Sequence, residues 1–422
     1  MPEPILENLV VADGAPSTWE ALGVAFSNRP GSRSLTSPGV PVAIVVPDLR
    51  AALEAVAFAV VANIDFLVIG RDRYSEAIRD LLGREGFAIV EVDSGSKTPP
   101  PVMVESVPGR VWLLTSGTTG TPKLVSHRWE TLYTRRTASD SSQRRWLVPY
   151  LAGTYAWYQL ICLGLFMPGQ SLVVAEVDDP QDLLAIAARD GVDSISATPT
   201  FWRLALLRAG ASGLRDLALK TLSLGGEMAD QPILDRLRET FPNVEISHVY
   251  ASTEAGACIV VKDGLAGFPA DLLDLETPGR PALKLVDGNL LVRSPYSTLA
   301  ANGRHEEWID TGDLVEIRGK RVCFLGRVNA KLINVGGNKA FPADIESAIL
   351  DHPEVSWCRV RAVRSPLVGF LPEVDLVLVG GATFDEVALT RHASERLPEY
   401  AVPRFWNLLE SIPVESTLKS SL

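Results

Sequence analysis

The chain has 422 residues, of which 46% are hydrophobic, and a formal net charge of -11. This length and composition allow a large core and two or more domains, and the acidic balance without a long run of Lys or Arg argues against a nucleic-acid partner. No apolar run is long enough to cross a bilayer and the first residues show no secretory signal, so we expect a cytoplasmic protein. Four scattered cysteines favour neither a disulfide framework nor a metal site.

Predicted strands and helices alternate from residue 42 onwards, after forty residues without a clear pattern. Apolar runs at 42–46, 64–69 and 87–92 predict buried strands, with helices predicted between them at 49–61 and 74–82. The same alternation returns at 181–189, 194–197, 201–208, 221–224, 231–240 and 245–250. This order is typical of a parallel sheet covered by helices, with functional groups at the carboxyl ends of the strands.

The pattern changes after residue 278 to short strands and turns, and again near Gly326. Helices are predicted at 343–350 and 383–396, and strands at 356–363 and 373–379. We therefore predict an α/β fold with two domains. The large N-terminal domain, residues 1–326, contains parallel-sheet α/β layers and a small β subdomain, and residues 327–422 form a small mobile α+β domain.

One segment, residues 115–123, combines small hydroxyl side chains, two glycines and a lysine directly after a predicted strand. Backbone N–H and hydroxyl groups on such a loop can converge on phosphate oxygens, because glycine permits close approach. The spacing differs from that of a Walker P-loop, and loops of this composition can also be simple turns. The predicted phosphate-binding residues are Thr115, Ser116, Gly117, Thr118, Thr119, Gly120 and Lys123.

The order of residues in this segment resembles the phosphate-binding signature of the adenylate-forming superfamily. That superfamily includes acyl- and aryl-CoA synthetases, luciferases and peptide-synthetase adenylation domains. Other segments resemble its remaining signatures in the same order, at residues 250–254, 308–314, 326–329, 333–346 and 412–419. The resemblance covers roughly the last three-quarters of the chain and is strongest to acyl- and aryl-CoA ligases.

The resemblance implies roles for particular residues. Tyr250 would stack on adenine, Thr253 would bond the α-phosphate, and Glu254 would hold Mg²⁺, which prefers carboxylate and phosphate oxygens. Asp313 would accept hydrogen bonds from both ribose hydroxyls, and Arg327 would contact ribose or phosphate. Further nucleotide-side contacts are expected from Gly226, Glu227, Ala251 (where glycine is usual) and Ser252.

The resemblance also implies two half-reactions in one site. A carboxylate attacks the α-phosphate of ATP, pyrophosphate leaves, and the thiol of coenzyme A then displaces AMP. Lys419 is expected to catalyse the first step, and Leu418 precedes it where glycine is usual. The C-terminal domain would then rotate about Asn329, where many relatives have Asp, and bring Gly337 and Lys339 to the nucleotide.

The acid pocket is expected between the apolar region after Tyr150 and the nearby strand ends. Candidate walls are Tyr150, Trp157, Phe201, Trp202 and Gly225, although buried aromatic residues are more often plain core. The histidine common in relatives is missing, because Tyr150 or Ala152 takes its place. No aspartate near Ala197 could bind an amino group, so an aryl or medium-sized acyl acid is preferred to an amino acid.

Two alternatives remain open. The first is a stand-alone adenylation enzyme that loads the phosphopantetheine arm of a carrier protein, which presents the same thiol as coenzyme A. The second is a degenerate relative that binds nucleotide without catalysis. Retention of Lys123, Glu254, Asp313, Arg327 and Lys419 argues against the second alternative.

Overall fold

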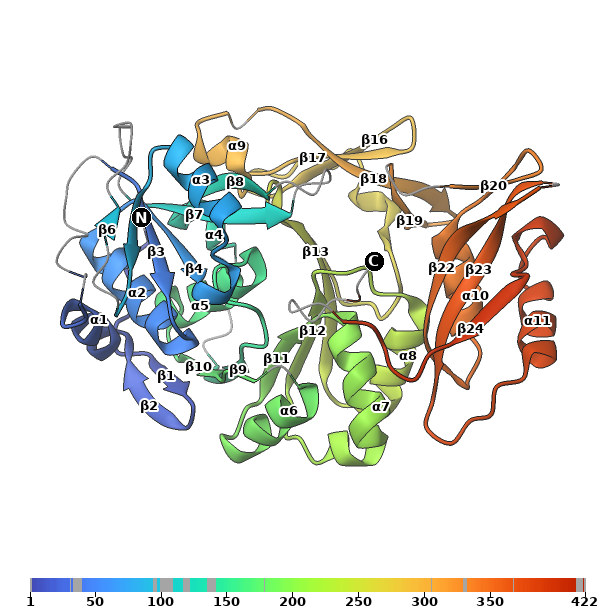
Figure 1. Ribbon diagram of the computed structural model, residues 1–422, viewed down its shortest axis with the longest axis horizontal. Coiled ribbons are helices and arrows are strands. Elements are labelled where there is room, and N and C mark those ends of the chain that lie inside the picture. Colours follow the sequence, from blue (N-terminus) through green and yellow to red (C-terminus); the bar gives the residue numbers. More distant parts are fainter. Residues whose placement is uncertain are drawn as a thin grey trace.

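The computed structural model describes residues 2–30, 32, 40–93, 97–98, 109–116, 122–134, 142–177, 179–304, 306–328, 332–366, 368–414 and 420. Strands within these ranges form four sheets. Figure 1 shows the N-terminal part at the left, the middle of the chain below the centre, and the C-terminal domain as a separate body at the right. The mixed α/β class and the separate C-terminal sheet were both predicted.

A six-stranded sheet contains the first strand–helix repeats. Its strand order is β6 (Lys97–Thr98), β5 (Ala88–Glu91), β3 (Val42–Val46), β4 (Phe66–Gly70), β7 (Arg110–Ser116) and β8 (Pro122–Arg128). All five residues of β3 are buried, which explains their uninterrupted apolar sequence. The connections include α2 (Leu49–Ala62), η2 (Arg71–Arg73) and α3 (Glu76–Arg84). Asp48 caps α2 by accepting a hydrogen bond from the backbone of Ala51.

An eight-stranded sheet forms the centre of the molecule. Its strand order is β14 (Gly256–Val261), β13 (Glu245–Ser252), β12 (Thr221–Gly225), β11 (Ser194–Ala197), β9 (Arg144–Leu147), β10 (Gln170–Val174), β1 (Leu9–Ala12) and β2 (Ala15–Thr18). The inner strands run parallel, and the two edge strands run antiparallel to their neighbours. The carboxyl ends of β12 and β13 therefore meet at one edge, as predicted.

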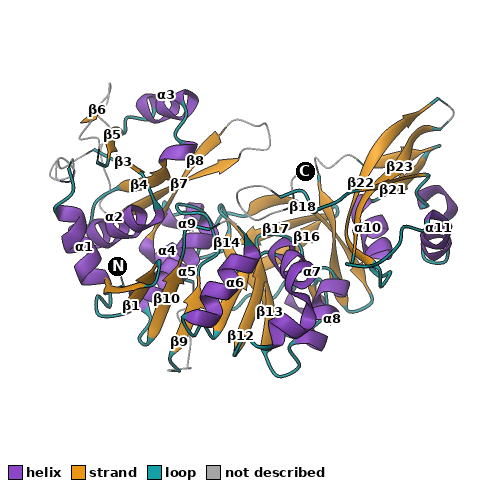
Figure 2. Ribbon diagram, turned by 60° about the horizontal axis from the view of Figure 1, so that its bottom comes forward, coloured by secondary structure: helices purple, strands orange, loops and turns teal. Residues whose placement is uncertain are grey.

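The helices of this part of the chain pack around the two parallel sheets (Figure 2). They are α4 (Trp129–Leu132), α5 (Tyr155–Phe166), α6 (Pro180–Arg189), α7 (Pro199–Arg215) and α8 (Gln231–Thr240). α7 is kinked at Gly210, whose φ of 65° is non-helical. Thr198 caps α7 and Asp230 caps α8 by accepting hydrogen bonds from backbone N–H groups of the first turn.

The first forty residues contain regular structure, which the sequence analysis missed. β1 extends the eight-stranded sheet beside β10, and α1 (Trp19–Ser27) buries Trp19, Leu22 and Phe26 completely. The β1–β2 hairpin turns at Asp13 and Gly14, both with positive φ. Asp-Gly between apolar residues is a hairpin signal, but four-residue strands show too little periodicity to be recognised with confidence from a pattern.

Two antiparallel sheets complete the chain. The β subdomain has the strand order β15 (Phe268–Pro269), β19 (Arg321–Arg327), β18 (Ile309–Arg318), β17 (Asn289–Arg293) and β16 (Ala282–Val286), with η3 (Ala270–Leu272) and α9 (Thr298–Ala301) nearby in sequence. The C-terminal sheet contains β21 (Asn338–Ala340), β20 (Ile333–Val335), β23 (Gly369–Leu378), β22 (Val355–Ser365) and β24 (Phe405–Leu408), with α10 (Pro342–Leu350), α11 (Glu386–Ser394) and η4 (Glu399–Ala401). Within the described residues, no helix combines the length and the apolar character needed to cross a membrane.

Candidate active site

A buried carboxylate lies where the large sheet meets the β subdomain. Asp313 Oδ2 accepts a 2.5 Å hydrogen bond from the Tyr250 hydroxyl, and Asp313 Oδ1 lies 2.9 Å from Nε of Arg327. The register of β18 and β19 places Asp313 opposite Arg327, whereas Tyr250 comes from the end of β13. Three residues predicted to contact one nucleotide are thus brought together from positions up to 77 residues apart in sequence. We call Tyr250, Asp313, Phe324 and Arg327 the nucleotide wall.

The ring of Tyr250 is fixed by a neighbour that the sequence analysis did not identify. Phe324 on β19 stacks on it, with ring centroids 5.0 Å apart and planes 29° from parallel. Burial, together with the adjacent Asp313 carboxylate, raises the pKa of Tyr250 above its ordinary range, so its hydroxyl remains protonated and donates. Nothing in the sequence distinguishes Phe324 from other apolar strand residues, because its contribution comes from packing alone.

The turn between β13 and β14 contains the predicted α-phosphate and metal residues, and neighbouring elements hold it from two sides. His127 Nε2 lies 2.6 Å from the carbonyl oxygen of Thr253, and the backbone N–H of Thr298 donates to the carbonyl oxygen of Glu254 at 2.8 Å. Ser252 Oγ also accepts a 3.0 Å hydrogen bond from the backbone of Ala255. The backbone around Thr253 and Glu254 is therefore fixed, while the Glu254 side chain is exposed.

The chemistry of His127 follows from its two neighbours. A carbonyl oxygen can only accept, so Nε2 must carry the proton that is donated to Thr253. Nδ1, which is unprotonated in the neutral ring, lies 3.0 Å from the Thr131 hydroxyl, and that hydroxyl also donates to the carbonyl oxygen of Arg128 at 3.0 Å. The His127 side chain is completely buried, and this burial lowers its pKa to about 4. His127 is neutral at pH 7 and joins the strand after the phosphate segment to the turn at Thr253.

The predicted phosphate segment is the end of an antiparallel hairpin. Thr115 on β7 pairs with Lys123 on β8, and the Lys123 side chain is exposed. The backbone of Ser116 continues β7. The predicted residues Gly117, Thr118, Thr119 and Gly120 lie outside the described residues.

Two of the predicted acid-pocket residues lie close together: Tyr150 follows the end of β9, and Gly225 is the last residue of β12. The Tyr150 hydroxyl is 3.4 Å from Ser196 Oγ, and a side chain at Gly225 would touch the same hydroxyl, because its Cβ would be 3.8 Å away. Burial raises the pKa of Tyr150 to about 12, so the hydroxyl is neutral at pH 7. Ser196 was not predicted as a pocket residue. The only indication in the sequence was a polar residue within a short strand that is otherwise buried.

The other predicted pocket walls are core residues in this conformation. Trp157, Phe201 and Trp202 have no exposed surface. Trp157 packs against Tyr158 with centroids 4.9 Å apart, and Phe201 packs against Trp202 at 5.4 Å. Because no surface of these three rings is accessible, the predicted contact with substrate finds no support in the structure, and the rings belong to the hydrophobic core.

Of the residues predicted from the C-terminal sequence signatures, only the neighbourhood of Lys419 is brought close to the central sheet within the described part of the chain. The Glu227 carboxylate accepts hydrogen bonds from Ser420, the residue after Lys419. Gly226, before it, is exposed with a φ of 83°. Gly337 and Lys339 are exposed on the β20–β21 hairpin, which Figures 1 and 2 show apart from β12 and β13. Lys419 and the predicted pivot Asn329 lie outside the described residues.

The chemistry of the acidic groups fits a magnesium ion bound mainly by phosphate oxygens. Among the residues that the structure describes, no three His, Cys, Asp or Glu side chains are grouped to hold a metal by themselves. Glu254 supplies one exposed carboxylate on a fixed turn. Mg²⁺ is commonly bound by one or two carboxylates together with substrate phosphates, so a single carboxylate here is sufficient.

The structure gathers residues predicted to contact a nucleotide at the edge of an α/β sheet, and a separate C-terminal domain follows. Comparison with known families gives the more particular result. The AMP-binding enzyme family matches residues 74–296, and the AMP-binding enzyme C-terminal domain matches residues 344–419. The chain belongs to the AMP-binding enzyme family, which confirms the resemblance found in the sequence.

Two curated relatives are similar to large parts of this chain. A 2-succinylbenzoate–CoA ligase from Geobacillus kaustophilus is 27% identical over 335 residues, covering 73% of this chain and 66% of that protein. A feruloyl-CoA synthase from an Amycolatopsis species is 23% identical over 353 residues, covering 78% of this chain and 72% of that protein. The matched part of the chain thus spans about two-thirds of the length of these relatives.

Two solved structures confirm the fold class. An anthranilate CoA ligase in complex with anthranoyl-AMP superposes with a TM-score of 0.76 at 17% identity, covering 99% of this chain and 93% of that chain. An O-succinylbenzoate coenzyme A synthetase from Bacillus subtilis, in complex with ATP and magnesium ion, superposes with a TM-score of 0.69 at 19% identity, covering 100% and 98%. At these identities the likeness concerns the fold.

Proposed function

We propose that the protein is an AMP-forming acid–thiol ligase. It joins a carboxylic acid to AMP with release of pyrophosphate, and then transfers the acyl group to the thiol of coenzyme A. The observation that supports this most directly is the nucleotide wall, in which Tyr250 and Arg327 fix the Asp313 carboxylate beside the turn that contains Glu254. The family membership and the named activities of the relatives agree with it.

The nucleotide wall is suited to adenosine. A carboxylate has about four acceptor positions on its two oxygens, and Tyr250 and Arg327 use one on each. The remaining positions of Asp313 accept from the two ribose hydroxyls. One face of the Tyr250 ring is covered by Phe324, and the other face is the one proposed to pack on adenine.

The phosphates extend from the wall toward the β7–β8 hairpin. Lys123 and the loop at 117–121 hold the β- and γ-phosphates, and Glu254 holds Mg²⁺. The bound ion would neutralise charge on the phosphate oxygens as the α-phosphate is attacked. Lys419 supplies a further positive charge at the acid and the α-phosphate, where negative charge builds up during attack.

Both steps are displacements with simple balances. A carboxylate oxygen forms a bond to the α-phosphorus as the bond from that phosphorus to pyrophosphate breaks. In the second step the thiol sulfur bonds to the acyl carbon, the thiol proton leaves to solvent, and the bond to AMP breaks. The domain rotation expected between the steps would withdraw Lys419 and bring in Gly337 and Lys339.

The proposed substrate is an aryl carboxylic acid with a polar substituent. Tyr150 and Ser196 place two neutral hydroxyls at the ends of the central strands, and Gly225 leaves that region free of a side chain. The relatives are named for succinylbenzoate and ferulate, both aromatic acids. Coenzyme A is preferred to a carrier protein because these relatives are named CoA ligases. Four free thiols fit the cytoplasm.

The first test is pyrophosphate release with ATP and Mg²⁺ across a panel of aryl, fatty and amino acids, with and without coenzyme A. Release with aryl acids, and formation of AMP that depends on coenzyme A, is the expected result. Release without any effect of coenzyme A would indicate a carrier-protein acceptor. Nucleotide binding without release, for every acid, would indicate a degenerate protein and would contradict the proposal.

Replacement of Lys419 by alanine separates the two half-reactions. We expect Lys419→Ala to lower pyrophosphate release by at least about a hundredfold, since removing one positioned charge from a transition state costs roughly 3 kcal/mol. Thioester formation from supplied acyl-adenylate should change little. Equal loss of both half-reactions would contradict the assignment of Lys419 to adenylation alone.

A further inference from the structure

Glu227 connects the central sheet to the last residues of the chain. It follows Gly226 after the end of β12, and its half-buried carboxylate accepts three hydrogen bonds. Oε2 accepts from the backbone of Thr200 at 3.0 Å. Oε1 accepts from both the backbone N–H and the hydroxyl of Ser420, at 2.8 and 3.3 Å. One side chain of the large domain thus holds both donors of Ser420.

Ser420 is important because of its neighbours. It directly follows Lys419, and an antiparallel bridge joins it to Val414 on the other side of residues 415–419. The residue that holds it, Glu227, is close in sequence to Gly225, which pairs with Val249 immediately before Tyr250. We call residues 414–420 the tail. The hydrogen bonds from Ser420 therefore attach the tail to the edge of the large sheet that also contains Tyr250 of the nucleotide wall.

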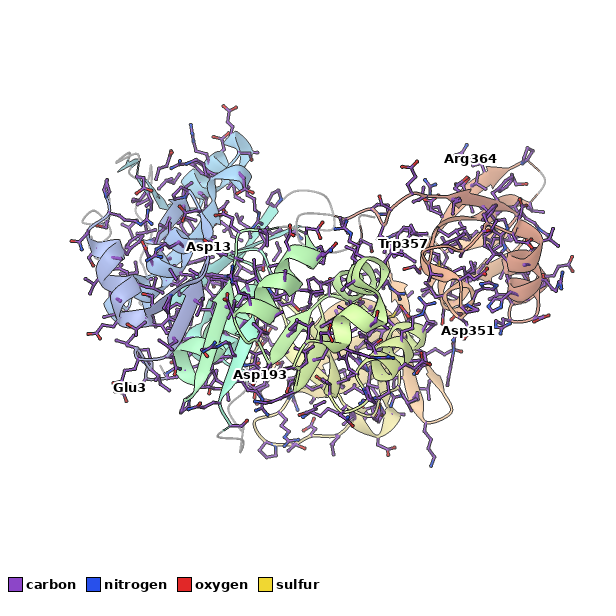
Figure 3. All side chains as sticks on the ribbon, turned by 90° about the horizontal axis from the view of Figure 1, so that it is seen from below. Glu3, Asp13, Asp193, Asp351, Trp357 and Arg364 are labelled. Atoms are coloured by element: carbon purple, nitrogen blue, oxygen red, sulfur yellow. The ribbon has the colours of Figure 1, made fainter. Side chains whose placement is uncertain are left out.

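Other contacts join the same surface of the large domain to the C-terminal domain. Arg203 on α7 donates to the carbonyl oxygen of Ser356 at 3.0 Å and forms an ion pair with Asp230. Arg236 on α8 donates to the carbonyl oxygen of Val355 at 2.8 Å. A small buried cluster also spans the two domains, formed by Leu204, Trp357, Val377 and Ile412. We call these residues the domain contact; Figure 3 shows Trp357 on the side of the C-terminal domain that faces α7 and α8.

We propose that Glu227 is a positioning residue for the adenylation half-reaction: by holding Ser420 it favours the domain arrangement in which the preceding residue, Lys419, acts. This inference rests on the proposed function. The sequence resemblance suggested a nucleotide contact for Glu227, whereas its hydrogen bonds are made to the tail. A rotation of the C-terminal domain that withdraws Lys419 must break the bonds to Ser420, so Glu227 assists one half-reaction and not the other.

A purely structural role would have different consequences. The bond from Thr200 lies in the first turn of α7, where a carboxylate can stabilise a helix. Thr198 already caps that turn by accepting from the backbone of Phe201 at 3.0 Å. If Glu227 only stabilised α7, its loss would lower protein stability and impair both half-reactions together.

The experiment compares full-length Glu227→Ala, Ser420→Ala, the double variant and Glu245→Ala. Glu245 is an exposed carboxylate at the opposite end of β13, paired with Lys262, and serves as the matched control. Acid-dependent exchange of pyrophosphate into ATP measures the first half-reaction, and thioester formation from supplied acyl-adenylate measures the second. Hydrogen exchange of the peptide that contains Ser420 measures attachment of the tail without any need for catalysis.

We expect Glu227→Ala to slow pyrophosphate exchange by about thirtyfold and Ser420→Ala by about threefold, because the first removes a charged acceptor and the second one hydroxyl bond. The double variant should be no slower than Glu227→Ala, since both changes remove the same interaction. Thioester formation should change less than about twofold, and Glu227→Ala should speed hydrogen exchange at the tail. Glu245→Ala should match the unaltered protein.

Equal losses in both half-reactions, or unchanged tail exchange in Glu227→Ala, would overturn the inference. The inference would also be overturned if the losses of pyrophosphate exchange in the two single variants added fully in the double variant. If the unaltered protein activates no acid, the proposed function fails, but the hydrogen-exchange comparison still decides whether Glu227 holds the tail. Ser420 contacts Glu227 and Val414 and belongs to none of the buried clusters, so its variant tests the contact without risk to the core.

Discussion

The nucleotide wall and the domain contact are built in different ways. In the nucleotide wall, Asp313 and Arg327 are paired in the ladder of β18 and β19, and the Tyr250 ring is stacked on Phe324. In the domain contact, arginine side chains donate to backbone carbonyls, and the apolar cluster has four fully buried members. Under the proposed domain rotation, the wall serves both half-reactions unchanged, whereas the contact forms and breaks in each cycle. Paired strands suit the first requirement, and a few separable hydrogen bonds suit the second.

The largest expected effect comes from breaking the nucleotide wall. Asp313→Ala removes the proposed acceptor for ribose and the carboxylate that Tyr250 and Arg327 contact. Two lost hydrogen bonds to a charged group are worth about 3 kcal/mol, so ATP should bind about a hundredfold more weakly. Calorimetric titration with MgATP measures this. Glu316→Gln, a change of an exposed carboxylate on the same strand, is the control and should bind normally. Normal affinity in Asp313→Ala would show that the wall does not bind ribose.

The nucleotide wall and the domain contact should affect stability in opposite ways as the pH changes. Burial lowers the pKa of His127 beside the nucleotide wall from 6.5 to about 4. The unfolded chain therefore binds more protons between these values, and the stability that depends on neutral His127 is lost as the pH falls from 6.5 toward 4. Burial raises the pKa of Glu346, close to the Arg203–Asp230 pair, from 4.5 to about 7. Stability that depends on protonated Glu346 is complete below pH 4.5 and is lost as the pH rises through 7.

Two variants isolate these opposite slopes. In Glu346→Gln only the pH dependence due to His127 remains. The free energy of unfolding of this variant should therefore rise by about 2 kcal/mol from pH 5 to pH 7. His127→Gln retains an N–H donor for Thr253 and leaves the glutamate effect, so its stability should fall over the same range. The fall should be of similar size, because burial shifts both pKa values by a similar amount. Urea unfolding at pH 5, 6 and 7 measures both, and slopes of the same sign would refute the assignment.

The smallest expected effect comes from a single hydroxyl group in the nucleotide wall. Tyr250→Phe keeps the ring stacked on Phe324 but removes the hydrogen bond to Asp313. The loss of about 1 kcal/mol should weaken ATP binding about fivefold. Tyr250→Leu, which also removes the aromatic face, should bind ATP more weakly still. If both variants bind equally, the ring does not pack on adenine.

Much of the fold could be predicted because local patterns and tertiary context agree. β3, β11 and α8 begin and end where their apolar periodicity or caps indicate. β1 and β2 could not be identified because each has only four residues; β1 depends on its pairing with β10, and β2 on its pairing with β1. Secondary structure is recoverable where a segment is long enough to show its period, and is hidden where pairing with a distant strand decides it.

The candidate site was predictable to the extent that its residues have distinctive chemistry in a fixed order. Tyr250, Asp313 and Arg327 were identified in this way, and the structure brings them together. Phe324 and His127 support the same site through packing and a backbone carbonyl, for which no sequence signature exists. The aromatic residues of α5 and α7 were attractive as pocket walls, but hydrophobicity alone does not reveal whether a ring faces a pocket or the core.

The pairing of β7 with β8 has a consequence for how this site can vary. Lys123 and His127 are four residues apart on β8 and therefore point to the same face of the sheet. A shift of β8 by one residue would turn both side chains to the other face and detach the turn at Thr253. Insertions or deletions between β7 and β8 would change the loop while the seven paired positions stay in place. The spacing between Lys123 and His127 is therefore fixed by the strand pairing, whereas a change of loop length would act on the proposed phosphate contacts alone.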